Sequence, residues 1–134
     1  MKEKADVVRG WLRKAASDMV TLEAALGAGA FDGACFHAQQ AAEKYLKGFL
    51  AFHDKPFPFT HNLGDLTELC ADIDILFRPL TPMASELTPY GVRLRYDDSF
   101  WPTLETAKQA RASALTVRDF VLRHLPKEIV DAAK

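Results

Sequence analysis

Arg118 and His124 are the residues of this sequence best suited to proton transfer at a phosphate group. They stand in the segment VRDFVLRH with five residues between them. An imidazole can transfer the proton of a hydroxyl group, and a guanidinium can stabilise the charge of a pentavalent phosphate. RNA supplies its own nucleophile, the 2′-hydroxyl, so such a pair needs no metal ion. The chemistry of the two side chains is therefore compatible with a reaction at a phosphate ester.

Helical geometry weakens this interpretation. Six residues along a helix turn the direction of a side chain by about 600°, which sets His124 roughly 120° away from Arg118. Fraying of the last turn, or a second chain, would have to bring the two together. In the alternative, His124 is a cation that interacts favourably with the dipole at a helix C-terminus. A match of this spacing is also expected by chance in a chain with four histidines.

Two arginines of the same segment fall on its apolar face. Arg111 and Arg118 are seven residues apart, among alanines, leucines and valines that recur with helical periodicity. A guanidinium on an apolar face must be paired or must line a cleft. We therefore expect either an anion-binding groove or salt bridges to Asp18 or Glu43.

A strip of polar residues follows the segment CFHAQQAAEKYLKG. His37, Gln40, Lys44 and Lys47 project opposite the apolar arc of an amphipathic helix. The strip could be a solvated face, a ligand contact in which Lys44 pairs with phosphate, or a contact with a partner. Phe36 lies on the polar side, where a monomer gains nothing from it. We therefore favour a dimer or partner face that includes Phe36, His37, Gln40 and Lys47.

Arginine and aromatic residues also gather in the segment RLRYDDSFW. Arg93, Arg95 and Tyr96 could bind phosphate and stack on a base. Alternatively, Arg–Asp pairs pin the segment as a structural loop. His61, in FTHNL, could touch the same ligand or could cap the following helix.

Other chemistries have little support in the sequence. Asp97 and Asp98 lack a third metal ligand nearby, and His53 and His61 form no zinc spacing with Cys35 or Cys70. The two cysteines are expected to be reduced core residues. No glycine-rich phosphate loop and no GxSxG motif occurs. We expect neither a metal nor another cofactor.

Apolar periodicity predicts the elements that must position these residues. We expect four or five helices: one from about Ala5 to Leu26, one over 32–53, one beginning near Thr60 to Asn62, a short or interrupted one within 75–90, and one from Ser99 or Pro102 to Leu125. Gly27 and Gly29 suit a helix end, and Asp32 suits the next N-cap. Strand signals are almost absent. The predicted fold is an all-α antiparallel bundle.

Length and composition limit the possibilities further. The chain has 134 residues, which suits a single domain with its core over about 6–125. The formal net charge of −1 disfavours nonspecific coating of DNA as a main role. No signal peptide and no apolar run of about 20 residues is visible, so we expect a cytoplasmic protein that does not enter a membrane.

Several of these segments together resemble a known family. The block FDGACFHAQQAAEKYLKG, the following THNL with Leu66 one turn later, and the flanking KAASDMVTLEAAL and RLRYDDSF resemble the HEPN family. HEPN stands for higher eukaryote and prokaryote nucleotide-binding domain. The resemblance extends from about residue 6 to residue 125.

The resemblance implies a helical bundle that usually works as a dimer. It further implies a minimal nucleotidyltransferase as protein partner, in a toxin–antitoxin-like pair. Many members are metal-independent ribonucleases with an Arg-x(4–6)-His motif, which Arg118 and His124 fit, while others bind only nucleotides or partners. In one branch a modified tyrosine stands two residues after the histidine, where this chain has Pro126. We expect a nucleotide- or RNA-binding module, with ribonuclease activity or a pure scaffold as alternatives.

Overall fold

The computed structural model describes residues 3–133, and the regular elements of that range are all helical. In chain order they are α1 (Lys4–Gly27), α2 (Phe31–Phe52), α3 (Leu63–Ile73), the 3₁₀ helix η1 (Ile75–Leu80), α4 (Thr81–Leu87), the 3₁₀ helix η2 (Thr88–Tyr90), α5 (Leu104–Arg123) and α6 (Lys127–Ala132). The predicted all-α bundle is therefore confirmed. The short α6 was not predicted: Pro126, expected to stop the last helix, also precedes the first residue of a new one.

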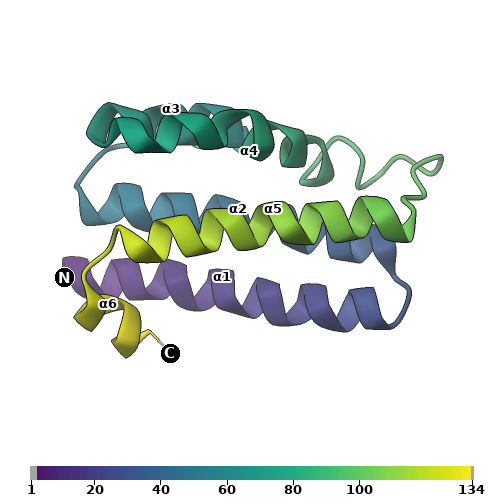
Figure 1. The fold of residues 1–134 in the computed structure, drawn as a ribbon, viewed down its shortest axis with the longest axis horizontal. Coiled ribbons are helices and arrows are strands. Elements are labelled where there is room, and N and C mark those ends of the chain that lie inside the picture. The colour runs from purple at the N-terminus through teal and green to yellow at the C-terminus, as the bar shows by residue number, and fades with distance from the viewer. Residues whose placement is uncertain (1–2, 134) are drawn as a thin grey trace.

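A three-residue connection turns α1 back into α2. Gly29 adopts a positive φ of 80°, a conformation that glycine reaches at little cost. The two helices consequently pack as an antiparallel pair (Figure 1). The expected N-cap was wrong, because Ala30 occupies that position without a side-chain cap and Asp32 lies in the first turn of α2. A carboxylate there still interacts favourably with the helix dipole.

Helix α2 lies at the centre of the bundle, between α1 on one side and α3 and α4 on the other, and α5 packs across its front (Figure 1). It runs in the same direction as α5. Alanines at positions 34, 38, 41 and 42 are fully buried, so neighbouring helices approach α2 closely along its length. This central position leaves α2 little surface of its own.

The chain doubles back between α2 and α3. The proline-containing segment 53–62 returns along α2, so His61 meets Glu43 in the middle of that helix. Asn62 then caps α3, its Oδ1 accepting the backbone N–H of Asp65 at 3.1 Å. Farther along, the Sγ of Cys70 approaches the carbonyl oxygen of Leu46. Helix α3 therefore accompanies the second half of α2.

The region from Ile75 to Tyr90 is broken into three short helices, as its prolines predict. Pro79 lies inside η1, while Pro82 and Pro89 stand in the first turns of α4 and η2. A proline in a first turn is tolerated because its missing N–H would have had no helical partner. The interruptions bend the chain toward the long loop 91–103 at one end of the bundle (Figure 1).

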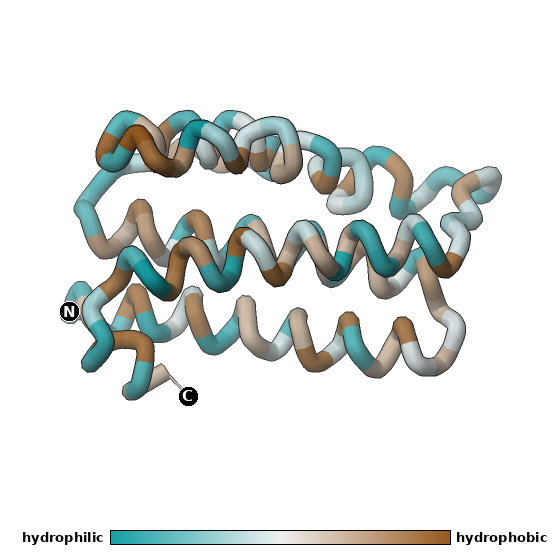
Figure 2. Tube along the Cα trace, in the orientation of Figure 1, coloured by the Kyte–Doolittle hydropathy of each residue, from teal (hydrophilic) through white to brown (hydrophobic). Residues whose placement is uncertain are grey.

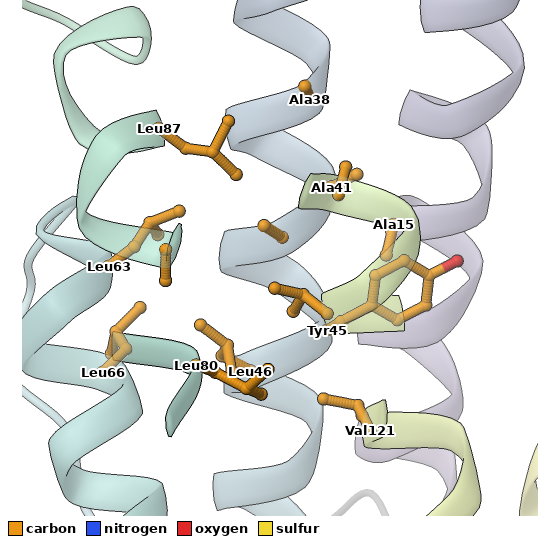
Figure 3. Close-up of a cluster of buried hydrophobic side chains, with 14 of the residues drawn as sticks. Ala15, Ala38, Ala41, Tyr45, Leu46, Leu63, Leu66, Leu80, Leu87 and Val121 are labelled. Atoms are coloured by element: carbon orange, nitrogen blue, oxygen red, sulfur yellow. The ribbon is translucent and has the colours of Figure 1, made fainter. Parts of the chain in front are cut away.

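Leucines from α3, η1 and α4 close the core against α2. Leu46, Leu63, Leu66 and Leu87 are at most 1% exposed (Figure 3). Each buried leucine contributes about 1.5–3 kcal/mol of burial free energy. Hydrophobic and hydrophilic residues alternate along the helices (Figure 2). No helix within residues 3–133 is both long and apolar enough to span a membrane.

Candidate functional site

Polar side chains are buried along α2, and they form two clusters. In the first, Asp18 of α1 accepts a hydrogen bond from Lys44 and lies 2.8 Å from Nδ1 of His37. Asp18 is only 8% exposed. Two members of the predicted polar strip are thus held against α1 within the chain itself. The partner contact predicted for His37 is limited to the part of its ring that stays exposed.

The second cluster centres on Glu43, which is 4% exposed. Its Oε1 accepts from Gln39 at 3.0 Å and lies 2.8 Å from Nδ1 of His61, and its Oε2 accepts from Lys47 at 3.1 Å. Gln40 extends the cluster by donating to Gln39 Oε1 at 2.7 Å. Both oxygens of the buried carboxylate are therefore satisfied, as burial of a charge requires.

Lys47 differs from the expectation of an exposed polar strip. It is 6% exposed, and its Nζ lies 5.6 Å from the ring centre of Trp11 and 5.7 Å from that of Phe57. These rings attract the ammonium group through their negatively charged faces. The helical projection placed Lys47 on the outside because it took no account of the segment that returns over α2.

The loop 91–103 borders a first cavity, of about 420 Å³, at the N-terminal end of α2. The guanidinium of Arg95 lies over the ring of Phe36, 4.0 Å from its centre. Tyr90 and Phe100 stack with their ring centres 5.7 Å apart. The full lining consists of Asp32, Gly33, Phe36, Tyr90, Leu94, Arg95, Tyr96, Asp97, Asp98, Phe100 and Trp101.

This first cavity joins Phe36 to the arginine-rich loop, a connection that the sequence did not reveal. Phe36, which we predict to face a symmetry mate, also contacts Arg95 of its own chain. Among residues 3–133 no carboxylate forms an ion pair with Arg95, so its positive charge remains available to a ligand. Tyr96 and Trp101 are 84% and 77% exposed. The cavity therefore offers a cation and accessible aromatic faces together.

A second cavity, of about 520 Å³, lies on another side of the same loop. His61, Asn62, Ser85, Thr88, Pro89, Val92 and Arg93 line it. The predicted ligand residues His61 and Arg93 thus meet at one cavity. Gly91 makes this possible, because a Cβ there would stand 2.6 Å from the side chain of Gln39.

The residues predicted on the last helix lie elsewhere. Arg111 pairs with Glu23 of α1, and Arg118 donates from Nε to Asp119 at 2.9 Å. The alternative partners expected from sequence, Asp18 and Glu43, were wrong, because both bind residues of α2. The two arginines pair instead with Glu23 of α1 and with Asp119 of α5.

His124 is the C-cap residue of α5, as the dipole interpretation requires. Its Nδ1 lies 2.7 Å from the carbonyl oxygen of Phe120, and its Nε2 lies 3.8 Å from Asp74. The ring also stacks on Phe120. Within one chain, Arg118 and His124 therefore contact different neighbours.

Comparison with known proteins decides the family. The model of the HEPN domain matches residues 8–125. This chain belongs to the HEPN family. It is also similar to the crystal structure of TT1696 from Thermus thermophilus, with 31% sequence identity and a TM-score of 0.76 over 88% of this chain and 98% of that one.

A second solved structure shares the fold. The structure of ST0689, an archaeal HEPN homologue, has 24% sequence identity and a TM-score of 0.71, and the similarity covers 92% of this chain and 98% of that one. No curated protein matches the sequence. The resemblance inferred from the second-helix block and THNL is thus confirmed at the level of the family.

Burial shifts the pKa of several side chains in this HEPN domain. It raises the pKa of Tyr45 to about 12, with Asp119 and Asp18 acting in the same direction and Arg118 against it. It also raises the pKa of Tyr90 and, to about 11, that of Cys35 beside Asp32. Hydrogen bonds from Ser99 lower the pKa of Asp97. Burial therefore favours the protonated form of these two tyrosines and of this cysteine.

Sequence reasoning missed the buried polar residues of α2 that hold His61 in place. Gln39 was not singled out, although it is fully buried and joins Gln40, Glu43 and His61. The sequence suggested Glu43 only as a salt-bridge partner for Arg111 or Arg118. The spacing of Glu43 and Lys47, four residues apart, was the available signal, since such pairs meet on one helix face.

Proposed function

We propose that this HEPN protein is a cytoplasmic, homodimeric module that binds a nucleotide or RNA at the surface of loop 91–103. The observation that carries the proposal is the unpaired Arg95 over Phe36 at the rim of the aromatic first cavity. Arginine and exposed aromatic rings on one surface are the combination that binds phosphate and stacks on bases. Family membership supports the same class of ligand.

The first cavity has groups for each part of a nucleotide. The exposed rings of Tyr96 and Trp101 can stack on a base, because every base has an apolar face. Asp32 and Asp98 can accept hydrogen bonds from amino groups of a base or from ribose hydroxyls. Arg95 supplies the positive charge that attracts the backbone. Because the guanidinium already rests on the Phe36 ring, Arg95 loses less conformational entropy when a ligand binds.

The binding test compares the wild type with Arg95→Gln, using a fluorescent single-stranded RNA and separately a nucleoside triphosphate. Arg13→Gln is the matched control, since Arg13 is exposed on α1 and lines neither cavity. We expect Arg95→Gln to weaken binding about tenfold, and Arg13→Gln to leave it unchanged. Equal affinity in all three proteins, or no binding by the wild type, would overturn the proposal.

The assembly part of the proposal rests on the family and on partly exposed residues of α2. Phe36, His37 and Gln40 are half-buried, so each retains surface for a second copy. A minimal nucleotidyltransferase is the proposed protein partner, in a toxin–antitoxin-like pair. Light scattering of the purified protein, alone and after co-expression with such a nucleotidyltransferase, tests both contacts. A monomer that captures nothing would contradict them.

RNA cleavage by Arg118 and His124 is the second candidate function. Their spacing fits the HEPN motif, and the side chain of Arg118 is about one-third exposed. Because the two residues contact different neighbours in one chain, fraying of the last turn of α5 or a second chain would have to bring them to one phosphate. Incubation of labelled structured RNA in EDTA, with the wild type beside Arg118→Ala, is the test. Cleavage by the wild type alone supports the candidate, and equal cleavage or none excludes it.

A further inference from the structure

The second cavity differs from the first in its charge. Its lining contains one arginine, one histidine and the polar side chains of Asn62, Ser85 and Thr88, but no carboxylate. The first cavity, in contrast, includes Asp32, Asp97 and Asp98. A cavity that presents an arginine and hydrogen-bonding side chains without a carboxylate in its lining favours an anion.

Arg93 is available to such an anion. Within residues 3–133 no acidic side chain forms an ion pair with it, although it is one of the exposed cations of loop 91–103. Guanidinium groups bind phosphate through two parallel hydrogen bonds. Arg93 therefore offers a charge and a directed pair of donors at the cavity.

His61 lines the same cavity and is held in place by a residue of α2. Its Nδ1 is held at 2.8 Å by Glu43, so Nε2 lies on the edge of the ring away from α2. No group within residues 3–133 forms a hydrogen bond or ion pair with Nε2. The carboxylate is itself fixed by Gln39 and Lys47. A histidine held in this manner has a defined orientation before any ligand arrives.

We propose that the second cavity binds a phosphate group between Arg93 and Nε2 of His61, with Glu43 as the positioning residue. In this complex His61 is an imidazolium that donates from Nδ1 to Glu43 and from Nε2 to the phosphate. The assignment rests on the proposed function and divides its ligand: base and sugar lie in the first cavity, and a phosphate lies in the second. Arg93 and Arg95 are two residues apart in the loop that borders both cavities. A single nucleotide or a short strand can therefore engage both.

The test titrates inorganic phosphate, adenosine 5′-monophosphate and adenosine separately into the full chain in a chloride buffer, and measures affinity by calorimetry. The variants are His61→Gln, Arg93→Gln and Arg95→Gln, with Arg13→Gln as the control. Since the side chain of His61 is 40% exposed and Arg93 is an exposed residue, these substitutions leave the fold intact. We expect His61→Gln and Arg93→Gln each to weaken phosphate binding about tenfold or more.

The outcomes separate this inference from the proposed function. If Arg95→Gln alone weakens monophosphate binding, the proposed function stands and the phosphate site is overturned. If phosphate binding depends on His61 and Arg93 while adenosine and Arg95 have no influence, the phosphate site stands and the proposed function fails. Equal effects of all four arginine and histidine variants would indicate nonspecific attraction and overturn the site.

The positioning role of Glu43 has its own readout. The paired substitution Glu43→Gln with Lys47→Met removes the carboxylate without leaving a buried lysine charge. Nitrogen NMR of the His61 ring reports whether each ring nitrogen carries a proton. In the phosphate complex of the wild type we expect both nitrogens to be protonated, because Nδ1 donates to Glu43 and Nε2 donates to the phosphate. The double variant should lose the proton at Nδ1 and bind phosphate severalfold more weakly, and unchanged protonation with unchanged affinity would overturn the role.

Discussion

Oε1 of Glu43 and Nδ1 of His61 lie 2.8 Å apart, so a buried carboxylate of α2 orients a histidine at the start of α3. The two residues are 18 positions apart in the chain. Lys47 occupies the other oxygen of the same carboxylate at 3.1 Å. The polar cluster thus joins the centre of the bundle to the surface where we place the ligand.

Replacing Glu43 by glutamine tests how much stability this cluster carries. Lys47 would keep its charge while buried at 6% exposure without its counter-ion. We expect the free energy of unfolding to fall by about 3 kcal/mol, measured by urea denaturation. Adding Lys47→Met should recover a large part of the loss, because the stranded charge is removed. A double variant as unstable as the single one would contradict this explanation.

Gly91→Ala tests the close approach of loop 91–103 to α2. The added Cβ would stand 2.6 Å from the side chain of Gln39, which is fully buried and bound to Glu43 and Gln40. We expect a loss of about 1–3 kcal/mol in the free energy of unfolding, as for other overpacked sites.

Gly10→Ala is the matched control for that substitution. Gly10 lies inside α1, and nothing stands within 4 Å of the position of its Cβ. Alanine favours a helix over glycine by about 0.8–1 kcal/mol, so thermal denaturation should show a gain in stability. Similar effects of the two substitutions would show that close packing at Gly91 is not the cause.

Tyr96→Ala and Trp101→Ala test base stacking in the first cavity. Both rings are largely exposed and line that cavity. Each substitution should weaken binding of single-stranded RNA by about 1–3 kcal/mol if its ring stacks on a base. Leu76→Ala, at a 60% exposed apolar residue outside both cavities, should change nothing. An equal loss in all three variants would point to a general effect of surface hydrophobicity.

The thiol of Cys35 gives a prediction for pH dependence. Burial, with a smaller contribution from Asp32, raises its pKa from 9.0 to about 11. At pH 8 only about 0.1% of the folded protein then carries the reactive thiolate. Alkylation by iodoacetamide, followed by mass spectrometry, should be slow, because Cys35 is fully buried and burial disfavours its thiolate. Complete reaction within minutes at pH 8 in native conditions would be inconsistent with this pKa.

The same shift affects stability in alkaline solution. The folded state disfavours the thiolate, so this contribution to stability is complete below the unfolded pKa near 9 and is lost as pH rises toward 11. Cys35→Ala should therefore flatten the loss of thermal stability over that range. An identical alkaline profile in the variant would mean that other groups dominate it.

The amino-acid sequence by itself determined the long helices and the family of this protein. Apolar residues of α1 recur at helical spacing, Gly29 marks the turn, and Pro79, Pro82 and Pro89 interrupt the region before the long loop. These signals are local: they depend on backbone preferences and on which side of a helix is apolar. The second-helix block and THNL were specific enough to identify the HEPN domain.

Only the tertiary structure decided which polar residues meet. The helical projection separates Lys47 from the core, yet the returning segment 53–62 covers it and places His61 on Glu43. Phe36 and Arg95 likewise come together from α2 and a distant loop. Such contacts depend on how far the chain travels between helices and where it folds back. Periodicity along a single helix does not contain that information, because a contact between distant segments is set by the packing of the whole bundle.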